Sequence, residues 1–81
     1  MKMVETKAVY YVDGKDILLA VRYPNFKMRK ALKELGFGTY KWQQGEWIGV
    51  ISKENLETLA RMFPWLKFRP ISKEEWKKGV W

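Results

Sequence analysis

Two stretches of the chain repeat one pattern, in which two strand-like runs joined at a glycine turn precede an amphipathic helix. In the first stretch, residues 6–12 (TKAVYYV) are β-branched and aromatic, and Asp13-Gly14 separates them from KDILLAVRY. In the second, TYKW and EWIGVI flank Gln43-Gln44-Gly45. A short turn containing glycine between such runs is a strong hairpin signal. The pattern therefore predicts a sheet built from two hairpins and is typical of a duplicated ββα unit.

The helix that follows each hairpin shows apolar residues at a 3-1-3 spacing, which is one stripe of a helix. The first helix is predicted over Phe26–Leu35, with Asn25 as its N-cap and Gly36 as the glycine at its end. The second helix is predicted to begin at Ser52 and to end before Pro64. The stripe positions that we expect to be buried are Met28, Leu32, Leu35, Leu56, Leu59 and Phe63.

The end of the chain adds a third helix and a fifth strand. A short strand is expected at about Leu66–Arg69. Ser72 and Glu75 form a capping box, which predicts a short helix from about Lys73. The resulting order is ββαββαβα. We expect one domain over residues 1–81, with an α+β fold: a two-layer sandwich whose mainly antiparallel sheet carries the helices on one face.

The residue types present exclude most catalytic and metal chemistry. The chain has no histidine and no cysteine, so thiolate nucleophiles, the usual zinc sites and the commonest general base are absent. No phosphate-binding loop and no nucleophile-elbow motif occurs. Asp13 and Asp16 bracket a hairpin turn, and Glu75 belongs to a helix cap, which are structural positions for acids. We therefore expect no enzymatic activity, no metal and no cofactor.

Hydropathy gives no sign of a membrane segment. The uncharged apolar run Ile17–Val21 is far shorter than the roughly 20 residues of a membrane span. The first residues contain no apolar stretch of signal-peptide length. We expect a cytoplasmic protein without a membrane partner. Richness in lysine and glutamate without cysteine is also typical of proteins from thermophiles.

The positive charge is concentrated in two regions. The net charge is +7, and residues 22–41 hold six cations against the single acid Glu34. Residues 61–81 hold the second excess. Lysines on a helix most often face solvent, but here aromatic residues accompany them, and bases stack on aromatic rings while cations follow the phosphates. The candidate nucleic-acid-binding residues are Lys27, Lys30, Lys33, Tyr40, Lys41, Trp42, Arg69, Lys73 and Lys77.

The region from Phe26 to Phe63 resembles a known family. A helix ending in Leu-Gly, a Tyr-x-Trp strand, a short turn, a Trp-x-x-Val strand and a serine-started, leucine-rich helix follow one another. This order resembles the HARP domain of annealing helicases and is similar to the damage-recognition domain of XPB-type helicases. The resemblance implies a module that engages single-stranded or forked DNA beside a helicase partner. By position it implies roles for Lys27, Lys30, Tyr40, Lys41, Trp42 and Trp47.

Two functions from different classes fit these observations. The first is a nucleic-acid-binding module, favouring DNA, single-stranded or forked, over RNA, although the sequence does not separate single-stranded, duplex and RNA ligands. The second is a protein-interaction or inhibitor module that docks on an acidic protein, because Trp and Arg also dominate protein interfaces. Salt separates the two, since nucleic-acid binding weakens steeply as ionic strength rises.

Overall fold

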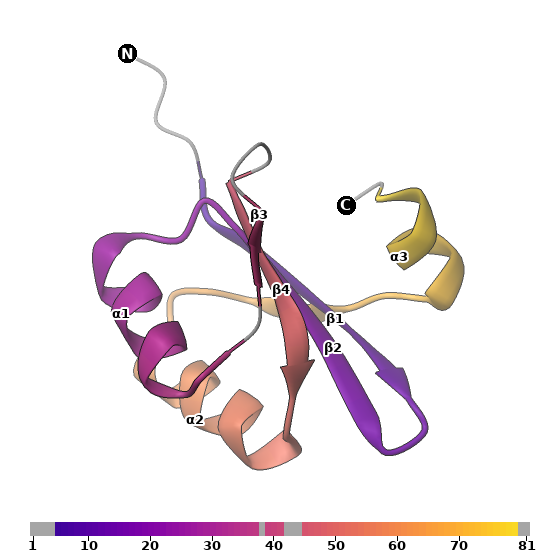
Figure 1. Ribbon diagram of the computed structural model, residues 1–81, viewed down its shortest axis with the longest axis horizontal. Helices are drawn as coiled ribbons and strands as arrows, with labels where there is room; N and C mark the ends of the chain where they lie inside the picture. The colour runs from indigo at the N-terminus through magenta and orange to yellow at the C-terminus, as the bar shows by residue number, and fades with distance from the viewer. Residues whose placement is uncertain (1–4, 38, 42–44, 80–81) are drawn as a thin grey trace.

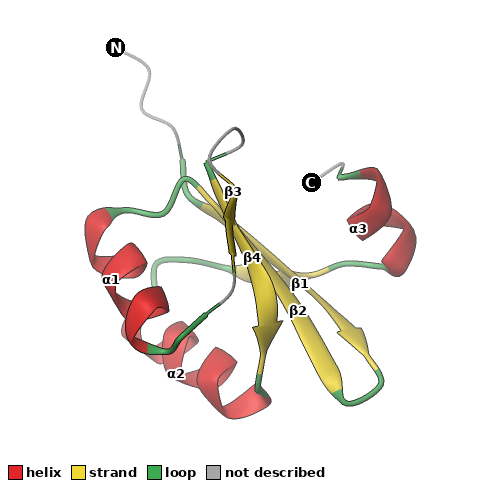
Figure 2. Ribbon diagram, in the orientation of Figure 1, coloured by secondary structure: helices red, strands yellow, loops and turns green. Residues whose placement is uncertain are grey.

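The computed structural model describes residues 5–37, 39–41 and 45–79, and for residues 39–41 it describes the backbone alone. The element order is ββαββαβα, as the sequence predicts (Figures 1 and 2). The strands are β1 (Lys7–Asp13), β2 (Asp16–Arg22), β3 (Thr39–Lys41), β4 (Glu46–Ile51) and β5 (Phe68–Pro70). The helices are α1 (Phe26–Glu34), α2 (Lys53–Met62) and α3 (Lys73–Lys78).

The five strands form one mixed sheet in the order β3-β4-β2-β1-β5. Three of the four strand pairs are antiparallel, and only β5 runs parallel to its neighbour β1. The α+β class and the mainly antiparallel sheet are thus confirmed. The second strands of the two hairpins, β2 and β4, pair at the centre, and each leads into a helix. This arrangement is the one that a duplicated ββα unit would produce.

Local sequence explains where the elements begin and end. Gly14 has a φ of +62° in the two-residue turn between β1 and β2, a conformation that costs glycine little. The Asn25 side chain accepts a hydrogen bond of 2.9 Å from the Met28 N–H, and so caps α1. Ser52 caps α2 in the same way. Ser72 opens the predicted capping box of α3, so all three helix starts are confirmed.

The main core lies between one face of the sheet and the two longer helices. α1 and α2 both cover this face (Figure 1). Of the six predicted stripe positions, Met28, Leu32, Leu59 and Phe63 are buried. Leu35 and Leu56 are half-buried and pack against the edge of the same cluster. The prediction that two principal helices share one face is therefore correct.

The third helix corrects the expectation that all helices lie on one face. α3 packs on the other side of the sheet (Figure 2), where Trp76 joins a second, smaller apolar cluster. The ring centroids of Tyr11 and Trp76 are 6.0 Å apart. The physical reason lies in β1 and β2, whose side chains are apolar on both faces, so that a second surface needs cover. The short helix α3 covers this second surface with Trp76.

The last strand begins later than predicted. The expected strand at about Leu66–Arg69 is observed at Phe68–Pro70, paired with Ala8–Tyr10 of β1. Leu66 is buried instead in a turn, where its N–H donates to the Phe63 carbonyl at 3.0 Å. Because the Leu66 side chain packs into the main core, the chain at Leu66 is not paired with β1, and the strand begins two residues later, at Phe68.

Candidate nucleic-acid interface

The two helices on the main face differ in charge. When α1 and α2 are aligned by their N-caps, Lys27 and Lys30 stand where α2 has Glu54 and Glu57. α1 carries four cations and one acid, whereas α2 carries two of each. Since both helices bury an apolar stripe against the same core, the difference is confined to their exposed sides. One half of the helix layer is therefore strongly basic.

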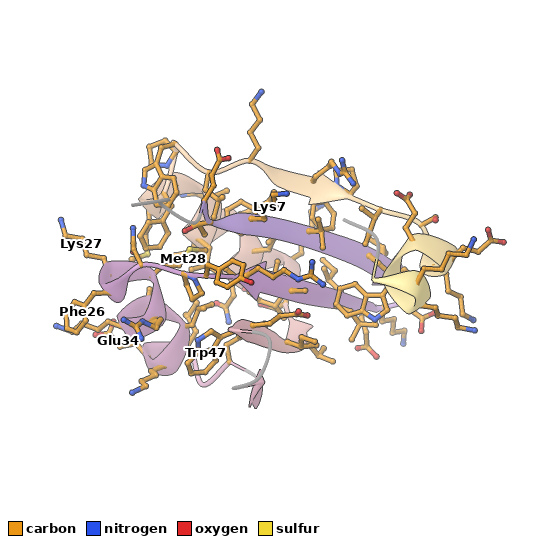
Figure 3. All side chains as sticks on the ribbon, turned by 90° about the horizontal axis from the view of Figure 1, so that it is seen from above. Lys7, Phe26, Lys27, Met28, Glu34 and Trp47 are labelled. Atoms are coloured by element: carbon orange, nitrogen blue, oxygen red, sulfur yellow. The ribbon has the colours of Figure 1, made fainter. Side chains whose placement is uncertain are left out.

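The exposed face of α1 combines these cations with an aromatic ring. Phe26, Arg29, Lys30 and Lys33 stand at spacings of three and four residues, so they share one side of the helix. This side is opposite the buried stripe. The Phe26 side chain is 74% exposed, which is unusual for so large an apolar group. In Figure 3, Met28 points from α1 toward the sheet, whereas Phe26 and Lys27 project away from it.

Residues from this side of α1 and one residue of β4 line a common cleft. It has a volume of about 520 Å³, and we call it the basic cleft. Its described lining consists of Phe26, Arg29, Lys30, Lys33 and Trp47. Trp47 of β4, labelled in Figure 3, is partly buried, packs against the main core and also lines this cleft. Two aromatic rings and three cations thus meet in one concave surface, and no acid belongs to that described lining.

The chain segment before α1 holds the two sides of the basic cleft together. Tyr23 lies in the left-handed region with φ of +54°, and its N–H donates to the Gly45 carbonyl at 2.8 Å. The Thr6 hydroxyl donates to the Tyr23 carbonyl at 2.7 Å. These bonds fix the start of α1 beside the start of β4, from which Trp47 comes. The position of Phe26 relative to Trp47 follows from this junction.

Glycine is required at the β4 side of the same junction. Gly45 has a φ of +57°, and a Cβ at this position would stand 3.1 Å from two carbons of the Tyr23 ring. Any other residue would meet both the left-handed backbone penalty and this contact. The close approach of Tyr23 to Gly45 therefore depends on the sequence at both positions.

On the opposite face of the sheet, Arg22 of β2 forms an ion pair with Glu46 of β4. The Arg22 Nε donates to the Glu46 Oε2 at 3.0 Å, and the Glu46 side chain is almost fully buried. Arg22 also lies 3.5 Å from the Gly79 carbonyl at the end of α3. Arg22 is thus committed to Glu46 and to α3, and its role is structural.

The structure brings only part of the predicted site together. Lys30 and Lys33 line the basic cleft, and Lys27 is exposed on α1 outside the described lining. Tyr40 and Lys41 belong to β3, where only the backbone is described, and Trp42 lies outside the described residues.

The C-terminal cations lie elsewhere. Arg69 is in β5 at the far edge of the sheet, and Lys73 and Lys77 are on α3 on the opposite face. α3 does not fold back toward α1, so these three residues do not extend the basic cleft.

Sequence reasoning missed two residues of the basic cleft. From the sequence, Phe26 is expected only to begin the first helix, and Arg29 is not among the candidate binding residues. The signal was present, because the spacing of Phe26, Arg29, Lys30 and Lys33 is that of one helix side. Trp47 entered only through the family resemblance, since its position on a strand gives no hint that it meets α1.

Comparison of the chain with protein-family models, curated proteins and solved structures finds no match. The resemblance to the HARP domain therefore stays a prediction. Within residues 5–37, 39–41 and 45–79, no group of three or more acidic side chains stands where it could hold a metal ion. Nor does any helix in the part of the chain that the structure describes have the length and apolar character to cross a membrane.

Proposed function

We propose that the protein is a non-catalytic nucleic-acid-binding module that engages DNA at the basic cleft. The observation that carries the proposal is the convergence of Phe26, Trp47 and three cations on one concave surface. Stacking on an aromatic ring contributes roughly 1–3 kcal/mol per base, and cations beside the ring attract the phosphates. Phe26 can stack with a base, and the three cations, within two turns of α1, can contact the phosphates.

Single-stranded or forked DNA is the proposed ligand form. A base reaches an exposed ring such as Phe26 only when it is unstacked, which a single strand allows and a closed duplex does not. The family resemblance supports the same ligand and adds a helicase as the proposed protein partner. The corresponding cell compartment is the cytoplasm.

A binding titration with labelled single-stranded, forked and duplex DNA tests the proposal. We expect single-stranded and forked strands to bind more tightly than duplex at about 50 mM salt, and heparin to compete with all of them. Phe26→Ala should weaken single-strand binding by roughly 5- to 150-fold, the equivalent of one lost stack. The ring is exposed, so this change should leave the thermal midpoint of unfolding unchanged.

Met62→Ala is the matched control for Phe26→Ala. Met62 is also a largely exposed apolar side chain, on α2, and it lies outside the lining of the basic cleft. The proposal fails if the parent protein binds no oligonucleotide at low salt. It also fails if an acidic protein or peptide binds and neither heparin nor salt weakens that complex, which is the behaviour of a protein-interaction module.

A further inference from the structure

We infer that the protein has a second site for single-stranded nucleic acid, at the other edge of the sheet, in which bases stack on Trp65. This inference rests on the proposed function, because it assigns the same class of ligand to a different surface. The site is a cleft of about 430 Å³ between the start of β1 and the segment that joins α2 to β5. We call it the edge cleft. Its lining consists of Glu5, Thr6, Lys7, Ala8, Val9, Trp65, Leu66, Lys67 and Arg69.

The turn after α2 forces Trp65 outward. Phe63 and Leu66, on either side of it, are both buried, and the Leu66 N–H bonds to the Phe63 carbonyl. Pro64 ends the helix between them. Trp65 makes an edge contact with Phe63, with ring centroids 6.1 Å apart and planes at 80°. The indole is thus held in place and still 56% exposed.

Three cations line the same cleft as this ring. Lys7, Lys67 and Arg69 line the edge cleft and are exposed, against the single acid Glu5 in the same lining. Arg69 lies 3.9 Å from Glu75, but both side chains are about half exposed, and such a pair is weak in water. The guanidinium therefore remains available to a phosphate. The edge cleft repeats the chemistry of the basic cleft, an exposed aromatic ring with three cations.

The strand arrangement disfavours an extended peptide as the occupant. A peptide that adds to a sheet needs an open strand edge with backbone donors and acceptors. Ala8–Tyr10 of β1 are already paired with β5 at this edge. β5 itself is three residues long and ends in Pro70, which has no N–H to donate. An anionic chain with planar bases needs no such edge, and it matches both the charge and the indole.

Because the two clefts lie on opposite halves of the sheet, one DNA strand that is long enough can bind to both. Trp47 of the basic cleft comes from β4, beside the edge strand β3, whereas the edge cleft lies at β5 and β1. When one strand reaches both clefts, the second contact forms at the effective concentration set by the linking nucleotides. Loss of either ring should then weaken the binding of a long strand, although neither loss abolishes it.

The test is anisotropy with a labelled oligothymidine of about 24 nucleotides, longer than a single small site would occupy. Trp65→Ala should weaken binding by roughly 5- to 150-fold relative to the parent, and Trp65→Phe, which keeps an aromatic face, should retain most of the affinity. Met62→Ala, an exposed apolar truncation outside both clefts, should bind as the parent does. Far-UV circular dichroism of each variant serves as the folding control.

The outcomes separate this inference from the proposed function. If the folded Trp65→Ala variant binds the strand as Met62→Ala does, the second site is refuted while the basic cleft stands. The same holds if a polyglutamate peptide binds in a Trp65-dependent way while the binding of the oligothymidine does not depend on Trp65. If a variant that combines Phe26→Ala with Lys30→Ala and Lys33→Ala still binds through Trp65, the edge cleft is supported independently. A parent protein that binds no strand at low salt overturns both proposals.

Discussion

Two large apolar residues of α1 show how position within a helix decides the role of a side chain. Leu32 is fully buried in the main core, whereas Phe26 lines the basic cleft and is mostly exposed. Burial of a leucine contributes about 1.5–3 kcal/mol to folding. Phe26 contributes little of this kind, so its ring is available to a ligand. The periodicity of α1 predicts the buried residue, and the same periodicity places Phe26 on the other side.

Leu32→Ala tests the core assignment. The substitution should lower the free energy of unfolding by about 2–5 kcal/mol, because Leu32 is fully enclosed by the main core. Urea denaturation followed by circular dichroism measures this change. A loss below about 0.5 kcal/mol, the size of an ordinary surface effect, would show that Leu32 is not in a packed core.

Tyr11 should make stability depend on alkaline pH. Burial, together with a hydrogen bond to Asp13 and the charge of that carboxylate, raises the pKa of the Tyr11 hydroxyl above its ordinary value. The folded state therefore favours the neutral phenol. This contribution to stability is fully present below the ordinary tyrosine pKa of about 10 and is lost as the pH rises through the folded-state pKa.

Tyr11→Phe isolates this contribution, because it keeps the ring that packs against Trp76 and removes the ionising group. Between about pH 8 and pH 11, the free energy of unfolding should fall more steeply in the parent than in the variant. Urea denaturation across this range provides the comparison. Parallel pH profiles for the two proteins would contradict the assignment.

At the scale of elements, local signals determine most of what is observed. Caps, glycine turns and 3-1-3 stripes were enough to predict the element order and the pairing within both hairpins. The side of the sheet taken by α3 was not predictable in this way, because a six-residue helix with one large apolar residue has no stripe to orient it. The start of β5 was missed for a related reason, since the burial of Leu66 is a tertiary effect.

Trp76→Ala tests the attachment of α3. The aromatic pair with Tyr11 contributes about 0.5–1.5 kcal/mol beyond the area it buries, and so short a helix is not stable alone. The substitution should release α3 and leave the main core folded. Amide hydrogen exchange of residues 73–79 should become much faster, while exchange in β2 stays slow. Unchanged protection of α3 would show that other contacts hold it.

At the scale of the whole molecule, the fold distributes the basic residues over separate surfaces, which the net charge of the sequence does not reveal. The sequence shows that residues 22–41 and 61–81 are basic, but it does not show that they serve different surfaces. Folding puts Arg29, Lys30 and Lys33 of α1 at the basic cleft, Arg69 at the edge cleft, and Lys73 and Lys77 on α3 on the opposite face. Both clefts join segments distant in sequence, such as α1 with β4. Their lining therefore could not be read from spacing alone.

The salt dependence of strand binding tests the central claim most directly. Each lysine that contacts a phosphate should contribute about 0.7 to the slope of log affinity against log salt for a single strand. Lys30→Ala combined with Lys33→Ala should therefore lower the slope by about 1.4. Lys15→Ala combined with Lys53→Ala removes the same charge from exposed lysines outside both clefts, and should leave the slope nearly unchanged. Equal slopes for the two double variants would contradict binding at the basic cleft.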